Sequence, residues 1–295
     1  MRTLNHLSLC SGIGGLDLAA ERAGFKTIGQ CEIDEYASKV LAKNFKGVPN
    51  LHDIRTVTNE RLAENGIEGS KITVVSAGFP CQPYSLAGKG LGDSDSRDLW
   101  GEVARVLGEI RPPWFVGENT PGLFARQNQR FFRKVLDDLV ALGYSVGWGI
   151  WGACDVGAPH QRERVFLLAH AHGGRRREIE FAKLCACKTL DQKRWQNQFG
   201  GTDSIYGDVS YSASDVVGMF GCESKTETTY DGGKNHGGGT EGDASGEWWQ
   251  TEPNVDRVVT RIPSRVDRLR CLGNAVVPQQ AYPIFKAIAD FYKEK

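Results

Sequence analysis

Short apolar runs alternate with amphipathic segments over the first 172 residues of the chain. Six of the runs are short and rich in aliphatic and aromatic residues, which predicts buried strands over residues 6–10, 27–33, 72–78, 114–119, 145–151 and 164–170. The segments between them place apolar residues three and four positions apart, which predicts helices over residues 16–24, 35–45, 98–110 and 131–143. Such alternation predicts an α/β fold: a mostly parallel sheet with helices on both faces.

The pattern changes after His172. Residues 200–246 contain 12 of the 36 glycines of the chain, many Ser, Thr and Asp, and few aliphatic residues. A disordered insert and a loop-rich recognition module that depends on a partner both fit this composition. The second is favoured because six aromatic residues could anchor a small core: Trp195, Phe199, Tyr206, Tyr211, Trp248 and Trp249. Residues 281–295 again have the spacing of an amphipathic helix.

Composition narrows the class of protein only slightly. The 36 Lys and Arg residues balance the 36 Asp and Glu residues, so the net charge neither indicates nor excludes a nucleic-acid partner. Eight scattered cysteines, of which only Cys185 and Cys187 are close, form neither a disulfide framework nor a paired zinc pattern. The chain has no apolar run of about 18 residues and no signal-peptide pattern at its start. We therefore expect a cytoplasmic protein with reduced thiols and no membrane contact.

A glycine-rich turn follows the first predicted strand. The sequence SGIGG places Gly12, Gly14 and Gly15 where they allow tight turning and close approach of the backbone to a ligand. Glu32 follows Gly12 by 20 residues, at the end of the second predicted strand, where a carboxylate meets ribose hydroxyls in nucleotide sites. Asp53 could sit at the tip of a third strand and bind an adenine edge. Because the spacing is GxGG rather than GxGxxG, a ligand-free turn and a cofactor site both remain open.

A lone cysteine, Cys81, stands in the sequence GFPCQPYS directly after an apolar run and Gly78. Pro80 and Pro83 restrict the backbone on both sides of it. A structural cysteine normally lies inside an apolar run, so this setting favours a nucleophile. The polar, glycine-rich sequence that follows predicts a loop over residues 82–100 that could close over a substrate.

Three charged residues stand at the ends of other predicted strands. Glu118 follows the apolar sequence WFVG, and Arg162 and Arg164 precede the last strand in the sequence HQRERVF. In a parallel sheet the strand ends converge at one edge, so Glu118 can lie near Cys81. Taken one at a time, the glutamate is equally typical of a surface strand end and the arginines of a solvated face. Because all three residues stand at strand ends, together they favour a functional site.

The sequence RPPW at residues 111–114 is similar to the (D/N/S)PP(Y/W) motif of amino-methyltransferases. Its first residue, Arg111, cannot accept a hydrogen bond from a target amine. We therefore interpret the two prolines as a helix stop before the next strand.

Five motifs, in the order of the family, resemble those of DNA (cytosine-5)-methyltransferases of the bacterial and phage type. GFPCQPYS is similar to the catalytic motif, GENT to the ENV motif, HQRER to the QxRxR motif, SGIGG to the first cofactor motif and GNAVVP to the last. The resemblance covers about the first 172 and the last 25 residues. Cys10 stands where the family usually has an aromatic residue, and Thr120 where it has valine. Candidates for the ninth motif are Arg257, Arg261 and Arg265.

The resemblance implies a Rossmann-like, S-adenosyl-methionine-dependent catalytic domain over residues 1–172. It implies a small, loop-rich target-recognition domain over residues 173–255 and a segment over 256–295 that returns to the catalytic domain. The implied catalytic residues are Cys81, Glu118, Arg162 and Arg164. Those implied for the cofactor are Gly12, Ile13, Gly14, Gly15, Glu32, Ile33, Asp53, Ile54, Gly78, Pro80, Leu99, Asn274 and Ala275. Those implied for DNA are Ser85, Lys89, Arg97, Arg257 and Arg261.

The activity implied by this resemblance is sequence-specific transfer of a methyl group from S-adenosyl-methionine to carbon 5 of a flipped-out cytosine, through a covalent Cys81 adduct. The product of the cofactor is S-adenosyl-homocysteine, and no metal is expected. The expected partner is double-stranded DNA, bound by a monomer, and a cognate restriction endonuclease acting separately is compatible with this role.

Three alternatives stay open at this point. An RNA methyltransferase of the same chemistry would lack a use for the separate glycine-rich segment. A catalytically silent DNA-binding relative would have no need of Cys81, Glu118, Arg162 and Arg164. A nicotinamide-dependent dehydrogenase would explain the GxGG turn but would leave the cysteine motif and the arginines unused.

Overall fold

The computed structural model of the chain describes residues 3–80, 99–125, 128–171 and 263–293. Cys81, the predicted loop 82–100 except its last two residues, and the predicted target-recognition domain over residues 173–255 lie outside these ranges. The described part contains the six predicted strands, the helices between them and the C-terminal segment.

The core of the molecule is a six-stranded sheet in the order β2-β1-β3-β4-β6-β5. Strands β1 to β4 are parallel neighbours, whereas β6 is antiparallel to both β4 and β5. The sheet is therefore mostly parallel, as the sequence predicts, with one reversed strand. The strands are β1 (Asn5–Leu9), β2 (Lys26–Cys31), β3 (Ile72–Gly78), β4 (Trp114–Asn119), β5 (Tyr144–Trp151) and β6 (Arg164–Ala171).

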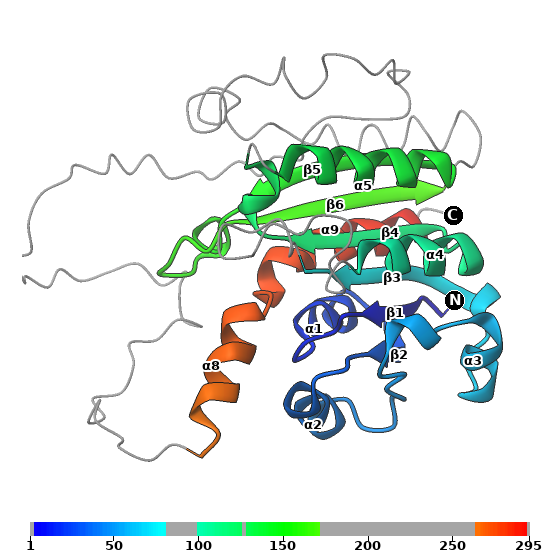
Figure 1. Ribbon diagram of the computed structural model, residues 1–295, viewed down its shortest axis with the longest axis horizontal. Helices are drawn as coiled ribbons and strands as arrows, with labels where there is room; N and C mark the ends of the chain where they lie inside the picture. The colour runs from blue at the N-terminus through cyan, green and yellow to red at the C-terminus, as the bar shows by residue number, and fades with distance from the viewer. Residues whose placement is uncertain (1–2, 81–98, 126–127, 172–262, 294–295) are drawn as a thin grey trace, which may run out of the picture.

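Helices cover both faces of this sheet (Figure 1). The predicted helices are confirmed as α1 (Gly15–Arg22), α2 (Glu35–Asn44), α4 (Trp100–Ile110), α5 (Gln129–Ala141) and α9 (Pro278–Phe291). Two further helices, α3 (Asn59–Glu64) and α8 (Arg265–Asn274), have no counterpart in the predicted elements. Helix α3 has only six residues and buries only Leu62, too few for a periodic pattern to reveal it. Helix α8 does have apolar residues three apart, Val266, Leu269 and Leu272, but all three are exposed and none packs in the core.

Two apolar clusters lie on opposite faces of the sheet. One joins Leu7, Val75 and Phe115 to the apolar sides of α4 and α5. The other joins the intervening strand residues, such as Val74 and Val116, to α1 and α9. Alternate residues of one strand point to opposite faces, and burial on both faces explains why these strands are apolar throughout. Helix α4 ends at Ile110, as the two prolines predict.

The third strand that the sequence predicted near Asp53 is absent from the described fold. The segment after α2 contributes only an isolated bridge between Gln30 and Asn50, beyond the edge strand β2. Asp53 instead precedes a short 3₁₀-helix, η1 (Ile54–Thr56), and its side chain accepts a hydrogen bond from the Arg55 amide. His52, which has a left-handed φ of 62°, turns the chain away from an extended path. The prediction that Asp53 lies at a strand tip is therefore wrong.

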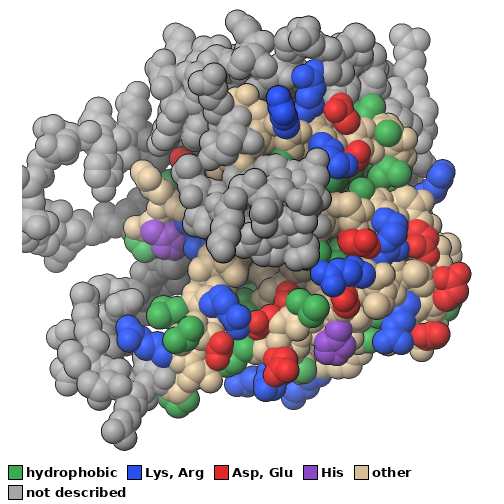
Figure 2. Space-filling model, in the orientation of Figure 1, with side chains coloured by type: hydrophobic (Ala, Val, Ile, Leu, Met, Phe, Trp, Pro, Cys, Tyr) green, Lys and Arg blue, Asp and Glu red, His purple; other side chains and the backbone are tan. Residues whose placement is uncertain are grey.

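In Figure 2, basic and acidic side chains are interspersed over the described part of the face that is shown, in keeping with the balanced charge of the chain. None of the helices in the four described ranges is long and apolar enough to cross a membrane.

A buried carboxyl group, Asp17, lies on α1 beneath the glycine-rich turn. It accepts hydrogen bonds from Ser8 Oγ (3.0 Å) and Gln30 Nε2 (2.8 Å). Burial raises the pKa of Asp17 to about 6, although both hydrogen bonds act in the opposite direction. The folded chain therefore holds a proton on Asp17 more tightly than the unfolded chain does. Stability should fall as pH rises through the interval between about 4 and 6 and stay lower above it.

We expect Asp17→Asn to remove this pH dependence without loss of stability near neutral pH. An asparagine can still accept from Gln30 and can donate its amide to the Ser8 hydroxyl, and it carries no buried charge. The raised pKa corresponds to about 3 kcal/mol that ionised Asp17 costs the folded state. Urea unfolding at several pH values from about 4 to about 8 would measure the effect, with Glu35→Gln, an exposed carboxyl on α2, as control. A marked loss of stability at about pH 7.5 would contradict this account.

Candidate active site and cofactor cavity

A cavity of about 550 Å³ opens at the carboxyl ends of the parallel strands. This edge is where ligands bind in open α/β sheets, because loops diverge there from neighbouring strands. The described residues bring ten of the thirteen predicted cofactor residues into its lining: Gly12, Ile13, Glu32, Ile33, Asp53, Ile54, Gly78, Pro80, Leu99 and Asn274. Two of the four predicted catalytic residues, Glu118 and Arg164, line the same cavity. The sequence motifs thus converge on one place in the fold.

The glycine-rich turn and Glu32 are joined by a direct hydrogen bond. Glu32 Oε2 accepts from the Gly12 amide at 2.7 Å, and Oε1 accepts from the Asp34 amide at 2.8 Å. Gly12 has a left-handed φ of 56°, and nothing lies within 4 Å of the place where a side chain would begin. A carboxylate has about four acceptor positions, so two remain on Glu32 for the hydroxyls of a ligand.

The other two glycines of the turn serve packing. A side chain on Gly14 would collide with the ring of Phe45, and one on Gly15 would come within 2.5 Å of the Val276 backbone oxygen. Neither glycine is among the lining residues, and Ala275 is not among them either. These three predicted cofactor residues instead lie where the turn, α2 and the C-terminal segment meet.

Two thiols line the cavity between the first two strands. Burial raises the pKa of Cys10 to about 12, and the charge of Glu32 adds to the effect. Burial also raises the pKa of Cys31, whose Sγ donates to the His52 backbone oxygen at 3.2 Å. Both cysteines therefore stay protonated at neutral pH and form an uncharged wall. Ile33, which is also in the lining, leaves 64% of its surface exposed.

Glu118 and Arg164 form a buried ion pair in the lining of the same cavity. Arg164 Nε lies 3.0 Å from Glu118 Oε1, and Glu118 is only 7% exposed. Burial raises the pKa of Glu118 to about 7, although the charges of Arg164 and Arg162 act in the opposite direction. Glu118 pairs in register with Gly78 across β3 and β4, three residues before Cys81. The strand ends thus converge as predicted, and they hold a carboxyl group that is close to half protonated at neutral pH.

Arg162 points away from this pair. Its Nη2 donates to the backbone oxygens of Gly273 (2.7 Å) and Leu272 (3.3 Å), and also to that of Ala275. Its own backbone oxygen accepts from Gln280 Nε2 at 3.0 Å, and its φ is left-handed at 36°. Arg162 therefore fastens the C-terminal segment to the loop before β6. The two arginines of the HQRER motif have different contacts, since only Arg164 reaches Glu118.

A family model for C-5 cytosine-specific DNA methylases matches residues 4–230 of the chain. The chain belongs to this family. The match confirms the family to which the five sequence motifs pointed, and the sheet with its strand-end cavity is the α/β fold expected of such a methylase.

Two of the relatives are type II methyltransferases of bacteria. The type II methyltransferase M.NgoBI of Neisseria gonorrhoeae is 39% identical over 166 residues, which cover 55% of this chain and 49% of that protein. M.HaeII of Haemophilus aegyptius is 34% identical over 169 residues, covering 57% and 51%. A solved structure from an Escherichia coli prophage, described as a candidate DNA modification methyltransferase, is 27% identical with a TM-score of 0.50, covering 64% of this chain and 50% of that one. The chain spans about half the length of the curated relatives it matches.

Several residues of this methylase shape the site without having been singled out in the sequence. Asn50 accepts from the Glu32 amide (3.0 Å) and the His52 amide (3.0 Å) and donates to the Glu32 backbone oxygen, so it joins the two cofactor segments. Arg270 of α8 reaches across the cavity mouth to Asp34 Oδ2 at 2.7 Å. Asn119 donates to the Phe79 backbone oxygen at 3.0 Å and holds the chain just before Cys81. Only Asn119 carried a sequence signal, because it belongs to the GENT motif.

Six predicted site residues of this methylase lie outside the described residues. They are the catalytic Cys81 and the five residues expected to contact DNA, Ser85, Lys89, Arg97, Arg257 and Arg261. In the ranges that the structure does describe, no group of three or more His, Cys, Asp or Glu side chains is arranged to hold a metal ion.

Proposed function

We propose that this methylase transfers a methyl group from S-adenosyl-methionine to carbon 5 of a cytosine in double-stranded DNA, through a covalent adduct with Cys81. The observation that carries the proposal is the buried Glu118, with its pKa of about 7, beside Arg164 and in register with Gly78. A carboxyl group of this kind suits the stabilisation of a pyrimidine ring to which a cysteine adds. A dehydrogenase would leave the cysteine motif and the arginines unused.

The chemistry requires a nucleophile because carbon 5 of cytosine is a weak one. Addition of the Cys81 thiolate to carbon 6 turns the ring into an enamine-like species whose carbon 5 can attack an electrophile. Positive charge nearby favours the thiolate, and we propose that Arg164, which lines the cavity beside Glu118, supplies it. Elimination of Cys81 then follows loss of the carbon 5 proton to a base, for which we propose water.

Glu118 acts on the opposite edge of the ring. In its protonated form it can donate a hydrogen bond to ring nitrogen 3 and so stabilise the negative charge that thiolate addition places on the ring. The exocyclic amine of cytosine can donate to the other carboxyl oxygen, which selects cytosine over thymine. Arg164 holds Glu118 in place and can bind the carbonyl oxygen of the base. We assign Arg162 to fastening the C-terminal segment, because its guanidinium contacts backbone oxygens there.

The residues of the cavity fit S-adenosyl-methionine. Glu32 and Asp53 supply acceptors for ribose hydroxyls and the adenine edge, Gly12 leaves open space beside the turn, and Ile33 and Leu99 supply apolar faces for a ring. The volume of about 550 Å³ lies within the range of small-molecule sites. When bound, this cofactor supplies a methyl group on a positively charged sulfur, which is the electrophile that carbon 5 requires.

Recognition of DNA is proposed for residues 173–255, with Arg257 and Arg261 beside them and Ser85, Lys89 and Arg97 in the loop after Cys81. Between residues 173 and 250 the chain has 9 Lys and Arg against 12 Asp and Glu, so this region is not a general phosphate binder. The target base must leave the helix, because carbon 6 is out of reach inside a duplex. We propose that a monomer carries out this reaction and that any partner endonuclease acts separately.

The test is to incubate the protein with unmethylated plasmid and S-adenosyl-methionine and to map 5-methylcytosine at base resolution. We expect methylation confined to one short sequence motif, and that result would also supply the recognition sequence. Absence of 5-methylcytosine from a folded protein that binds S-adenosyl-homocysteine would refute the proposed substrate. Transfer RNA would then be the next acceptor to test, followed by DNA binding without turnover.

A further inference from the structure

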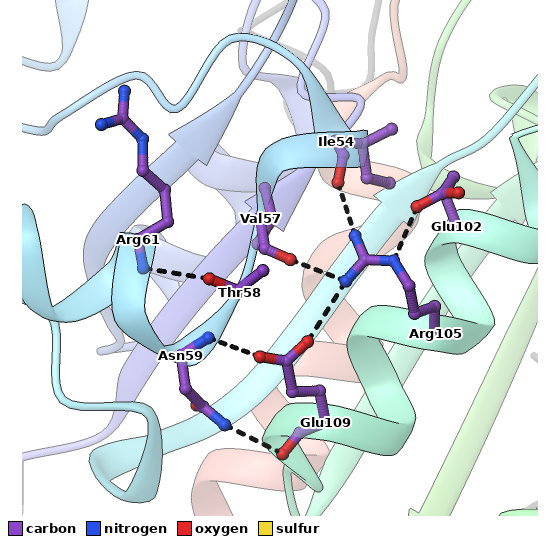
Figure 3. A network of polar contacts seen from close by, with 8 residues as sticks. All are labelled: Ile54, Val57, Thr58, Asn59, Arg61, Glu102, Arg105 and Glu109. Atoms are coloured by element: carbon purple, nitrogen blue, oxygen red, sulfur yellow. Dashed lines mark hydrogen bonds and ion pairs between the residues drawn. The ribbon is translucent and has the colours of Figure 1, made fainter.

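The cavity wall that contains Asp53 and Ile54 is held from outside the cavity by helix α4. Arg105 of α4 donates from Nη2 to the Ile54 backbone oxygen and from Nη1 to the Val57 backbone oxygen, each at 2.9 Å. Figure 3 shows the guanidinium between these two carbonyl groups, so that one side chain spans the whole of η1.

The guanidinium and the end of the loop are in turn fixed by two glutamates of the same helix. Arg105 Nε lies 2.7 Å from Glu102 Oε2, and Nη1 lies 3.2 Å from Glu109 Oε2. The second oxygen of Glu109 accepts from the Asn59 amide at 2.6 Å, and its backbone oxygen accepts from Asn59 Nδ2 at 3.3 Å (Figure 3). One face of α4 therefore holds residues 54–59 at both ends.

Residues 54–57 need such a support because none of them belongs to a described strand. The chain before them is tied to β2 and its end through residues 49–52. Beyond that point no described strand pairs with η1 to fix its carbonyl groups. The side chains of Ile54 and Val57 are buried, but Asp53 stands at the N-terminal end of η1 and is about one-third exposed. The position of its carboxylate in the cavity therefore depends on where η1 is held.

We propose that Arg105 is a positioning residue for the cofactor. Its hydrogen bonds to the Ile54 and Val57 carbonyl groups keep Asp53 and Ile54 in the cavity wall that receives the adenosyl group. The inference rests on the proposed function. The planar fork of an arginine matches two carbonyl oxygens at once, whereas a lysine offers a single charged nitrogen. Arg105 touches no lining backbone other than that of η1, so its effect should be on cofactor affinity rather than on the chemical step.

We expect Arg105→Gln to weaken binding of S-adenosyl-homocysteine by about tenfold, the size of one lost charge-assisted hydrogen bond. Arg105→Lys should restore part of the affinity, because it can still reach one carbonyl oxygen. At saturating S-adenosyl-methionine, kcat and the KM for DNA should stay near wild type while the KM for S-adenosyl-methionine rises. Calorimetric titration with S-adenosyl-homocysteine provides the first readout without any need for turnover.

Arg61→Gln is the matched control. Arg61 lies on α3 in the same region, but its guanidinium pairs with the exposed Glu64 and its only bond to the loop comes from its backbone amide, which donates to Thr58 (Figure 3). Its removal should leave the cofactor affinity unchanged. Glu109→Gln provides a second test should Arg105→Gln fail to fold, because it weakens the hold on Arg105 and should lower affinity in the same direction by a smaller factor.

The outcomes separate this inference from the proposed function. Variants of Arg105 and Glu109 that bind S-adenosyl-homocysteine as wild type does, even with lowered melting temperatures, would overturn the positioning role and leave the proposed function intact. A fall of about tenfold in kcat, without a change in cofactor affinity, would overturn the positioning role as well. Failure of the wild-type protein to bind S-adenosyl-homocysteine would refute the proposed cofactor and this inference together.

Discussion

Replacing Cys81 with alanine is expected to abolish methyl transfer while leaving the fold intact. The residue supplies the nucleophile that makes carbon 5 of cytosine reactive, and no other thiol in the described lining can take its place. Burial keeps Cys10 protonated, with its pKa raised to about 12, and it raises the pKa of Cys31 in the same way. Cys271, the third thiol of the described lining, also has its pKa raised by burial. Loss of a catalytic nucleophile typically lowers kcat by about 10⁴-fold or more. Tritium transfer from labelled S-adenosyl-methionine to plasmid DNA would measure the residual rate.

Cys154→Ala is the control for this substitution. Cys154 lies in the short turn η6 (Cys154–Val156) and is not among the residues that line the cavity, so its loss should leave the rate unchanged. Circular dichroism and binding of S-adenosyl-homocysteine should be unaltered in both variants. A duplex with 5-fluorocytosine at the mapped target should trap wild-type protein covalently, since fluorine blocks the final elimination, and should not trap the Cys81→Ala variant. Appreciable turnover by that variant would refute covalent catalysis by Cys81.

Glu118→Gln should lower the rate of methyl transfer by about 10²- to 10⁴-fold, the usual contribution of a general acid. It should also change the shape of the pH profile. Because the pKa of Glu118 is about 7, the wild-type protein loses the protonated carboxyl as pH rises through neutrality. Ionisation of the thiol, with an ordinary cysteine pKa of about 8.5, acts in the opposite sense. The wild-type kcat/KM should therefore rise up to about pH 7, stay level between about pH 7 and 8.5, and fall above that interval.

The glutamine variant carries no proton to lose, so its lower rate should rise with pH up to about 8.5, level off there and show no descending limb at higher pH. Glu68→Gln, which removes an exposed carboxylate paired with Lys71, should behave as wild type in rate and profile. The buried position of Glu118 also predicts the effect on stability. Its ionised form is disfavoured in the folded state, so neutral glutamine should not lower the free energy of unfolding at about pH 8. A descending limb that persists in Glu118→Gln would assign the acid to another group.

Features that depend on neighbouring residues could be predicted from the sequence. The six strands and five of the helices have apolar residues at regular spacing, and their burial against both faces of the sheet follows from it. The motifs stand at strand ends, and parallel strands bring their carboxyl ends to one edge, so Gly12, Glu32 and Glu118 meet in one cavity. The five motifs also identified the methylase family before any comparison, because their residue types and order are specific.

Features that depend on partners far along the chain could not be predicted in this way. Nothing in HQRER distinguishes Arg164 from Arg162. Arg164 pairs with Glu118, whereas Arg162 donates to the backbone oxygen of Gly273, 111 residues further along the chain. Asp53 precedes η1 rather than ending a strand, and η1 is held by Arg105, 51 residues from Ile54. The sequence by itself determined the elements, the family and the candidate residues, since these follow from local periodicity and motif order. Only the tertiary structure decided the burial of Glu118, and with it a pKa near 7, because the low polarity around a carboxyl group depends on everything that packs against it.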